Sequence, residues 1–433
     1  MKSGICFQIS VGISIVGKQM DVGIILFVIR ITAMVLTSMV TLYALWLGAI
    51  AIFGNLIPEK SYPHARPHTF AVIIPARNEE KVIVQLIDSL NRQKYPQECY
   101  KIFVVAHNCT DKTAEMAENA GAEVIIRNAD GEFKIHALSY GLDIVEERYG
   151  DAFEYVAVFD ADALVDENFL AEINDVLDGT QADCASGYYA SKNFDTNIIS
   201  QLSGMLYHVL MCCNSMADNR LNLPVNVYGS GYAFKFPWRR LFHQIDTIVD
   251  DFEFSCLMVL NRAKLVAAPK AVIYAEMPEK MQDALIQRQR WAFGDTQCYR
   301  KYRHDFRKAI VTHGMSGLKQ YMDLVMNPVV LLTAFGLVLW ILDAILHGIR
   351  VRQVIYGAIA LIITYLVFEL MALFLLKKES LQIRPGVKAM LLFPFWVLLS
   401  GWEAIVSVLK HDIEWKPTKR NSSKKIEDMK GAE

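Results

Sequence analysis

Long apolar blocks stand on both sides of a stretch of ordinary globular composition. The block Ile31–Leu56 carries no charge and would be ~39 Å long as a helix, which is enough to cross a bilayer. Three further blocks, Val329–Leu346, Val354–Leu376 and Ala389–Leu409, are each close to the roughly 20 residues that a span needs. The pattern predicts a membrane anchor, a soluble domain and a C-terminal membrane bundle.

The two ends of the chain refine this organisation. The apolar N-terminus lacks a small-residue cleavage site, so we interpret it as an uncleaved leader. One interpretation places this leader at the membrane surface. The basic tail indicates a cytoplasmic end, but three full crossings after a cytoplasmic domain would place it outside. Pro394 makes the last block the leading candidate for a re-entrant or interfacial segment. The predicted divisions are 1–30 (leader), 31–56 (transmembrane helix), 57–325 (soluble domain, with an interfacial helix near 281–300), 326–410 (bundle of two or three spans) and 411–433 (tail).

Short apolar runs alternate with helical patterns inside the soluble domain. The runs predicted to be strands are Phe70–Pro75, Lys101–Ala106, Glu123–Arg127 and Tyr155–Phe159. The predicted helices are Glu79–Leu90, a helix capped by Thr110 and Asp111 that ends near Ala120, and Ala137–Glu147. This alternation indicates βαβ units, and therefore an α/β fold with a mostly parallel sheet.

A polar cluster follows directly after three of these strands. The clusters are Ala76–Glu80, His107–Asp111 and Asp160–Asp162. Ligands of open α/β sheets bind at the carboxyl ends of the strands. The sequence therefore predicts a ligand site at this edge of the sheet.

The motif Asp160-Ala-Asp162 has the chemistry of a metal and nucleotide site. Two carboxylates on alternate residues at a strand end can share a ribose hydroxyl and a divalent cation, because Mg²⁺ and Mn²⁺ prefer oxygen ligands. The cation would offset the charge on a departing nucleoside diphosphate. A solvated acidic loop is the alternative for so short a motif.

Two later motifs add candidate chemistry. A carboxylate of Asp250-Asp251 can take a proton from a hydroxyl, although the helix dipole alone also favours acids at a helix N-terminus. In Gln287-Arg-Gln-Arg-Trp291, Gln287 and Arg290 share a helix face, Arg290 can clamp a phosphate, and Trp291 offers a flat face to a sugar ring. The stretch Met281–Trp291 also fits a basic amphipathic helix on a membrane surface.

Composition narrows the class of protein. A net charge of −2 gives no indication of nucleic acid as a partner. The eight cysteines include no CxxC pair, so we interpret them as reduced thiols of a cytoplasmic domain. A transporter is a rival class, but the chain lacks the two halves of matching hydropathy that a transporter would show.

Together the motifs resemble the family 2 glycosyltransferases of the membrane-integrated, processive kind, such as cellulose, chitin, hyaluronan and poly-N-acetylglucosamine synthases. The resemblance covers Phe70 to Trp291. It implies a GT-A fold for the soluble domain, with a similar anchor before it and a similar bundle after it. The motifs that carry it, in the family's order, are Pro75-Ala-Arg-Asn-Glu-Glu80, Asp160-Ala-Asp162, Gly229-Ser-Gly231, Asp250-Asp251 and Gln287-Arg-Gln-Arg-Trp291.

The resemblance implies a role for each matched position. Asp251 would be the general base and Asp162 the ligand of Mg²⁺ or Mn²⁺. The residues that would bind the nucleotide-sugar donor are Pro75, Ala76, Asn78, Glu80, Asp111, Lys134, Asp160, Gln287 and Arg290. The residues that would bind the acceptor are Gly229, Ser230, Gly231 and Trp291.

Three positions depart from the family's pattern. His107 stands where many relatives have an aspartate, Ile135 replaces the glycine after Lys134, and Asp250 stands where glutamate is usual. These departures bear on the selectivity for the nucleobase and the sugar of the donor more than on activity. A catalytically dead scaffold would have lost Asp162 or Asp251, and both remain.

The expected activity is inverting transfer of a sugar from a UDP-sugar to a growing β-linked polysaccharide. The alternative is transfer of one sugar to a lipid acceptor. The expected location is a bacterial-type cell membrane, with the catalytic domain in the cytoplasm. The expected partners are the donor, the polysaccharide or lipid acceptor and membrane lipids.

Overall fold

The computed structural model describes residues 2–131, 133–346, 385–409 and 424–430 and the single positions 355, 359, 366 and 374, with side chains from residue 24 on. The strands are β1 Phe70–Ala76, β2 Tyr100–His107, β3 Glu123–Arg127, β4 Tyr155–Val158, β5 Leu164–Val165, β6 Cys184–Ser191, β7 Tyr232–Lys235 and β8 Leu265–Ala275. The helices are α1 Lys2–Leu56, α2 Ile83–Asn91, α3 Thr113–Asn119, α4 Lys134–Tyr149, α5 Phe169–Thr180, α6 Ile198–Leu210, α7 Ala217–Arg220, α8 Asp250–Leu260, α9 Met281–Thr312, α10 Met315–Leu324, α11 Met326–Leu346, α13 Val387–Leu409 and α14 Ile426–Lys430, with the short helices η1 Gln97–Cys99, η2 Met211–Met216 (a π-helix) and η3 Phe236–Gln244.

One mixed sheet forms the centre of the soluble domain, in the order β3-β2-β1-β4-β7-β6-β8-β5. The four strands predicted from the sequence form one parallel part of it, because β1 pairs in parallel with β2 and β4, and β2 with β3. β6 and β8 form a second parallel pair. β7 then runs antiparallel to both β4 and β6. The predicted α/β fold with a mostly parallel sheet is confirmed.

Both faces of the sheet are covered, which explains the unbroken apolar runs of its strands. Along β1, Ala71 and Ile73 belong to one core cluster, whereas Phe70, Val72 and Ile74 belong to the other. All five side chains are fully buried. Polar groups can gather at the ends of the strands without disturbing either core.

The predicted helices begin at different residues from those observed. α2 begins at Ile83 rather than Glu79, because the chain first makes a turn in which the Val82 amide donates to the Glu79 carbonyl at 3.0 Å. α3 begins at Thr113, with Lys112 in the N-cap position. Asp111 still serves this end of the helix, since its carboxylate accepts the Thr113 amide at 3.0 Å.

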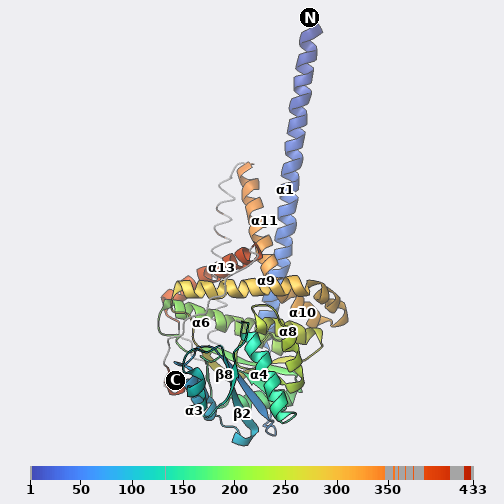
Figure 1. Ribbon diagram of the computed structural model, residues 1–433. Coiled ribbons are helices and arrows are strands. Elements are labelled where there is room, and N and C mark those ends of the chain that lie inside the picture. The colour runs from blue at the N-terminus through green and yellow to red at the C-terminus, as the bar shows by residue number, and fades with distance from the viewer. Residues whose placement is uncertain are drawn as a thin grey trace.

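Within the described residues, three helices are long and apolar enough to cross a membrane, over Ile24–Leu56, Met326–Leu346 and Val387–Leu409. α1 and α11 lie side by side and point away from the soluble domain (Figure 1). An ion pair at 3.4 Å joins Arg30 of α1 to Asp343 of α11. α1 is one continuous helix through residue 30, where the sequence analysis placed a boundary. The predicted block 354–376 and most of the tail 411–433 lie outside the described residues.

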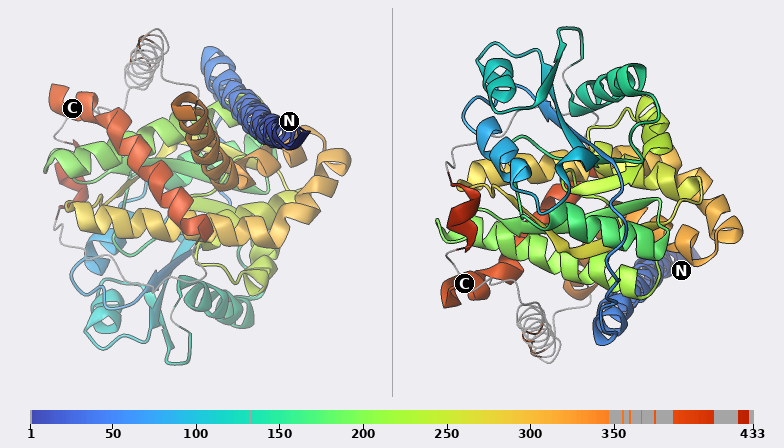
Figure 2. Two further views of the ribbon diagram at one scale, coloured as in Figure 1. Left: turned by 90° about the horizontal axis from the view of Figure 1, so that it is seen from above. Right: turned by 90° about the horizontal axis from the view of Figure 1, so that it is seen from below.

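The third of these helices, α13, contacts α9 and α6 and crosses over them obliquely, and it also lies across the direction of α1 and α11 (Figures 1 and 2). Its inner face buries Phe393, Trp396 and Ala404 against the soluble domain, and its outer face exposes Phe395 and Leu398. One face on protein and one apolar face outward is the arrangement of an interfacial helix. This arrangement supports the interfacial interpretation of the block around Pro394, while the domain divisions and the number of spans stay predictions.

Candidate functional site

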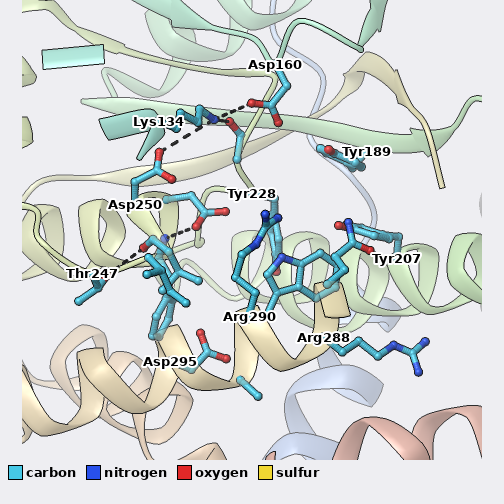
Figure 3. A pocket seen from close by; sticks show the side chains of 18 of the residues that line it. Lys134, Asp160, Tyr189, Tyr207, Tyr228, Thr247, Asp250, Arg288, Arg290 and Asp295 are labelled. Carbon is cyan, nitrogen blue, oxygen red and sulfur yellow. Dashed lines mark hydrogen bonds and ion pairs between the residues drawn. The ribbon is translucent and has the colours of Figure 1, made fainter. Parts of the chain in front are cut away.

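A cavity of about 1470 Å³ opens at the carboxyl ends of the parallel strands and continues to the apolar helices α1, α11 and α13, and this second end is called the membrane end (Figure 3). Its sheet end is lined by 75–82, His107, Asp111, 133–135, Ala137 and 160–162. Its membrane end is lined by Tyr43, Leu47, Leu206, Leu210, Asn214, Asn226, Tyr228, Ala292, Asp295, Asp323, Met326, Asn327, Val330, Val397, Ser400, Gly401 and Ala404. The start of α8 and the segment 287–291 of α9 lie between the two ends.

The cavity collects nearly all of the residues that the sequence analysis selected. The thirteen that line it are Pro75, Ala76, Asn78, Glu80, Asp111, Lys134, Asp160, Asp162, Gly229, Asp251, Gln287, Arg290 and Trp291. Ser230 and Gly231 are not among its lining residues. The Ser230 hydroxyl oxygen accepts the Asp160 amide at 2.9 Å, and the Gly231 amide donates to the Val158 carbonyl at 2.8 Å. These two residues therefore hold the end of β4 in place from behind the cavity.

Lys134, at the first position of α4, ties three parts of the site together. Its Nζ lies 2.7 Å from Oδ1 of Asp160 and 3.9 Å from Oδ2 of Asp250, and it donates a hydrogen bond to the Gly229 carbonyl. Burial opposes the charge of Lys134, but the Asp160 and Asp250 carboxylates hold its pKa above the usual value. A cation thus stays fixed where β4, α8 and the glycine segment meet.

The loops after β1 and β2 brace each other at the sheet end. Asn78 has a positive φ of 59°, and its Oδ1 accepts the Thr110 amide at 2.8 Å. The Glu80 amide donates to Oδ2 of Asp111 at 3.2 Å, while Oδ1 of Asp111 accepts from Thr113. Burial acts to raise the pKa of Asp111, yet these hydrogen bonds outweigh it and lower the pKa. Asp111 is therefore a charged group that fixes the shape of this edge.

Asp251 lies in the first turn of α8, where its Oδ1 accepts the Phe252 amide at 2.8 Å. Burial, together with the neighbouring Asp250 carboxylate, raises the pKa of Asp251 to about 6, against the opposing effect of Lys134. A carboxylate with a pKa just below neutral is ionised at pH 7 and can still accept a proton readily. Asp251 thus has the protonation behaviour that a general base needs.

Gly229 separates two of these carboxylates. A Cβ atom built on Gly229 would lie 3.5 Å from Oδ2 of Asp251 and 3.6 Å from Oδ2 of Asp160. The residue also has a φ of +57°, a conformation that L side chains rarely adopt. Glycine at this position therefore leaves the space between the carboxylates open to a ligand.

Aromatic rings form one wall between the two ends of the cavity. Trp291 meets Tyr207 edge-on, with ring centroids 5.5 Å apart, and Tyr207 stacks on Tyr189 at 4.9 Å. All three residues line the cavity. Their flat apolar faces suit a sugar ring.

The sequence analysis missed Tyr189, Tyr207 and Asp295. Neither β6, which carries Tyr189, nor α6, which carries Tyr207, was among its predicted elements. Asp295 lies one helical turn after Trp291 and so shares its face of α9, a spacing that could have identified it. Burial, reinforced by the Asp251 and Asp323 carboxylates, raises the pKa of Asp295 to about 8.

The residues present fit a divalent cation that is shared with a phosphorylated ligand. Within the described residues, no group of three or more His, Cys, Asp and Glu side chains could hold a metal ion by itself. Asp162 lines the cavity and is 6% exposed. Mg²⁺ and similar cations often take one or two carboxylates from the protein and complete their shell with phosphate oxygens and water.

The fold and the cavity together define an enzyme domain of the GT-A type. A family model described as "Glycosyltransferase like family 2" matches residues 67–294, just over half of the chain. The chain belongs to glycosyltransferase family 2, and it is a glycosyltransferase. The finer resemblance to cellulose and chitin synthases stays a prediction.

Known relatives agree with this assignment. A probable glycosyltransferase from Sulfolobus acidocaldarius is 23% identical over 256 residues, which is 56% of this chain and 53% of the relative. A beta-monoglucosyldiacylglycerol synthase from Nostoc sp. is 34% identical over 109 residues, 24% of this chain and 22% of the relative. The matched part thus spans about half of the first relative's length and less of the second.

One solved structure has the same fold over most of the chain. The mannosyltransferase PcManGT from Pyrobaculum calidifontis, in complex with GDP-Man and Mn²⁺, superposes with a TM-score of 0.58 at 18% identity. The match covers 88% of this chain and 99% of that one. At this identity the likeness shows the fold alone.

Proposed function

We propose that the chain is an inverting glycosyltransferase that moves a sugar from a UDP-sugar to an acceptor hydroxyl presented at a membrane. The observation that carries this proposal is the single cavity that joins Lys134, Asp251 and Arg290 to the membrane helices α1, α11 and α13. A soluble sugar nucleotide can enter at the sheet end, and a membrane-bound acceptor can enter from the other.

The donor lies at the sheet end in this proposal. The nucleoside is bordered by Pro75, Ala76, Asn78, Glu80 and Asp111, and Asp160 faces the ribose. The diphosphate lies against Lys134, Gln287 and Arg290, since a fixed ammonium and a guanidinium stabilise the charge of a leaving diphosphate. When bound at Asp162, Mg²⁺ or Mn²⁺ supplies further positive charge to the same leaving group.

Asp251 is the general base of the proposed reaction. It removes the proton of the acceptor hydroxyl as the oxygen attacks the anomeric carbon. A new C–O bond forms there, and the bond to the diphosphate breaks with its electron pair on the diphosphate oxygen. A single displacement inverts the anomeric carbon, so an α-linked donor gives a β-linked product.

The acceptor hydroxyl is carried by a lipid in the first version of the proposal. Apolar side chains of three apolar helices line the membrane end, among them Leu47 of α1, Val330 of α11 and Val397 of α13. They provide a place for a hydrocarbon stem next to the proposed base. A growing β-linked polysaccharide is the second candidate, because the wall of Tyr189, Tyr207 and Trp291 suits a chain of sugar rings.

The proposed setting is a bacterial-type cell membrane with the catalytic domain, residues 57–325, on the cytoplasmic side. UDP-sugars are cytoplasmic metabolites in such cells, and the seven free cysteines described are compatible with a reducing compartment. The transmembrane helix at 31–56 and the bundle at 326–410 attach this domain to the membrane, with the leader at 1–30 before them and the basic tail at 411–433 after them.

The proposal is tested with the purified full chain in lipid nanodiscs, Mn²⁺ and a panel of UDP-sugars. We expect UDP release with at least one donor, and its loss in Asp251→Asn but not in Asp305→Asn, a change at an exposed position of α9. Chromatography of the products separates one glycolipid spot from a polymer ladder. Undiminished turnover by Asp251→Asn would overturn the assignment of the base.

A further inference from the structure

The membrane end of the cavity has a distinctive charge composition. It holds the carboxyl groups of Asp295 and Asp323, and Asp251 lies at its border. Its other polar side chains are neutral hydroxyls and amides, from Tyr43, Ser400, Asn214, Asn226, Tyr228 and Asn327. The described residues assigned to this end include no lysine and no histidine, and the arginine beside it is Arg288, which lines the cavity and packs on Trp396 of α13.

The nearest lysine beneath this end is already neutralised. The Lys319 side chain is 2% exposed, and its Nζ lies 2.6 Å from Asp323 and 2.9 Å from Asp218. Asp323 also accepts a hydrogen bond from Asn226 at 2.7 Å. Because two carboxyl groups share one ammonium, this buried group offers no excess positive charge to a ligand.

The other cations of the cavity lie elsewhere. Lys134 is held by Asp160 and Asp250 at the sheet end. The Arg288 guanidinium lies 3.8 Å from the centroid of the Trp396 ring and donates to the Trp396 carbonyl at 3.3 Å. In the close view, Arg288 points away from Asp295, and Arg290 points up toward the region of Asp250 (Figure 3). The charges of Lys134 and Arg290 thus lie toward the proposed diphosphate, whereas the Arg288 guanidinium is engaged by the ring and the carbonyl of Trp396.

We propose that the acceptor is uncharged: a hydroxyl group on a neutral, sugar-like headgroup whose hydrocarbon stem lies at the membrane end, so that a lipid phosphate is rejected there. Carboxylates accept hydrogen bonds from hydroxyls but repel a phosphate, and neutral amides and hydroxyls supply no charge to offset that repulsion. The wall of Trp291, Tyr207 and Tyr189 gives the same headgroup a stacking surface. This inference rests on the proposed function, since it names the acceptor class of the same site.

Two short amphiphiles with the same tail test the inference directly. The full chain in nanodiscs, saturated with UDP to fill the sheet end, is titrated with octyl glucoside and with octyl phosphate below their micelle concentrations. The shift in unfolding temperature reports binding without any turnover. We expect octyl glucoside to bind at a concentration at least ~10-fold lower than octyl phosphate. Equal or tighter binding of octyl phosphate, or no binding of octyl glucoside, would overturn the inference.

A charge substitution sharpens the test. In Asp295→Lys we expect octyl phosphate to bind ~10-fold more tightly than in the unchanged protein, since the new ammonium faces the membrane end. Asp305→Lys, at an exposed position of the same helix, is the matched control and should leave the binding of both ligands unchanged. The comparison of ligands on the unchanged protein stands even where Asp295→Lys does not fold.

Turnover separates this inference from the proposed function. If no UDP-sugar is consumed but octyl glucoside still binds preferentially, the proposed transfer is wrong, and the inference that this end of the cavity takes an uncharged group still holds. If UDP-sugar is consumed and the phosphate lipid is the better acceptor, the transfer is right and the inference is wrong.

Discussion

The two ends of the cavity are built in opposite ways. The sheet end is assembled from strand ends and the residues that follow them, such as Asp160 after β4 and Asn78 after β1. Lys134 is held there by its ion pair with Asp160. The membrane end is assembled from helices far apart in the chain, with Tyr43 and Asp323 lining it together. The difference is what a charged, water-soluble donor at one end and a membrane-bound acceptor at the other, as proposed, would require. α9 lies between the soluble domain and the apolar helices α1 and α11 (Figure 1).

The largest expected effect lies at the border between the ends. Asp251→Asn keeps the shape of the side chain and removes the base, so we expect kcat to fall about 10³-fold, within the usual range for general bases. The affinity for UDP, measured by titration calorimetry, should stay within about twofold. A loss of UDP binding instead would place Asp251 at the sheet end.

The next effect should be confined to the sheet end. Lys134→Met removes the cation shared by Asp160 and Asp250, so we expect the KM for the donor to rise about 100-fold and the unfolding free energy to fall by about 3 kcal/mol. The KM for the acceptor should stay unchanged. Lys308→Met, at an exposed position of α9, controls for the loss of a lysine.

The pH profile should report the buried base. Because the pKa of Asp251 is raised to about 6, its ionised, active form is lost as the pH falls through 6. We expect kcat/KM to be flat above that value and to fall about tenfold per pH unit below it. An acid limb that begins near pH 4, the region of an ordinary aspartate, would contradict the burial of this carboxylate.

The smallest of these effects should be confined to the acceptor. Trp291→Ala removes one ring of the aromatic wall, and ring contacts contribute about 0.5–1.5 kcal/mol, so we expect the KM for the acceptor to rise roughly three- to tenfold. Trp291→Phe should recover part of this loss. An equal rise in the KM for the donor would show that the two ends are not separate.

The same contrast explains how much the sequence could predict. Strand ends and their polar clusters are local in the chain, so the motifs at 75–80, 160–162 and 287–291 predicted most of the sheet end and its border. Tyr189, Tyr207 and the membrane end depend on helix packing, which no short motif encodes. Ser230 and Gly231, which the sequence predicted to bind the acceptor, contact the backbone at the end of β4 and do not line the cavity. A glycine motif does not show which of its residues face a cavity.

The central claim is that acidic and basic side chains far apart in the chain converge on one metal and one diphosphate. An experimental structure of the full chain with UDP and Mn²⁺, with data at a wavelength where manganese scatters anomalously, tests it most directly. The account predicts an anomalous peak beside the Asp162 carboxylate and the diphosphate between Lys134 and Arg290, within reach of Asp251. UDP bound on another surface, or a peak away from Asp162, would contradict it.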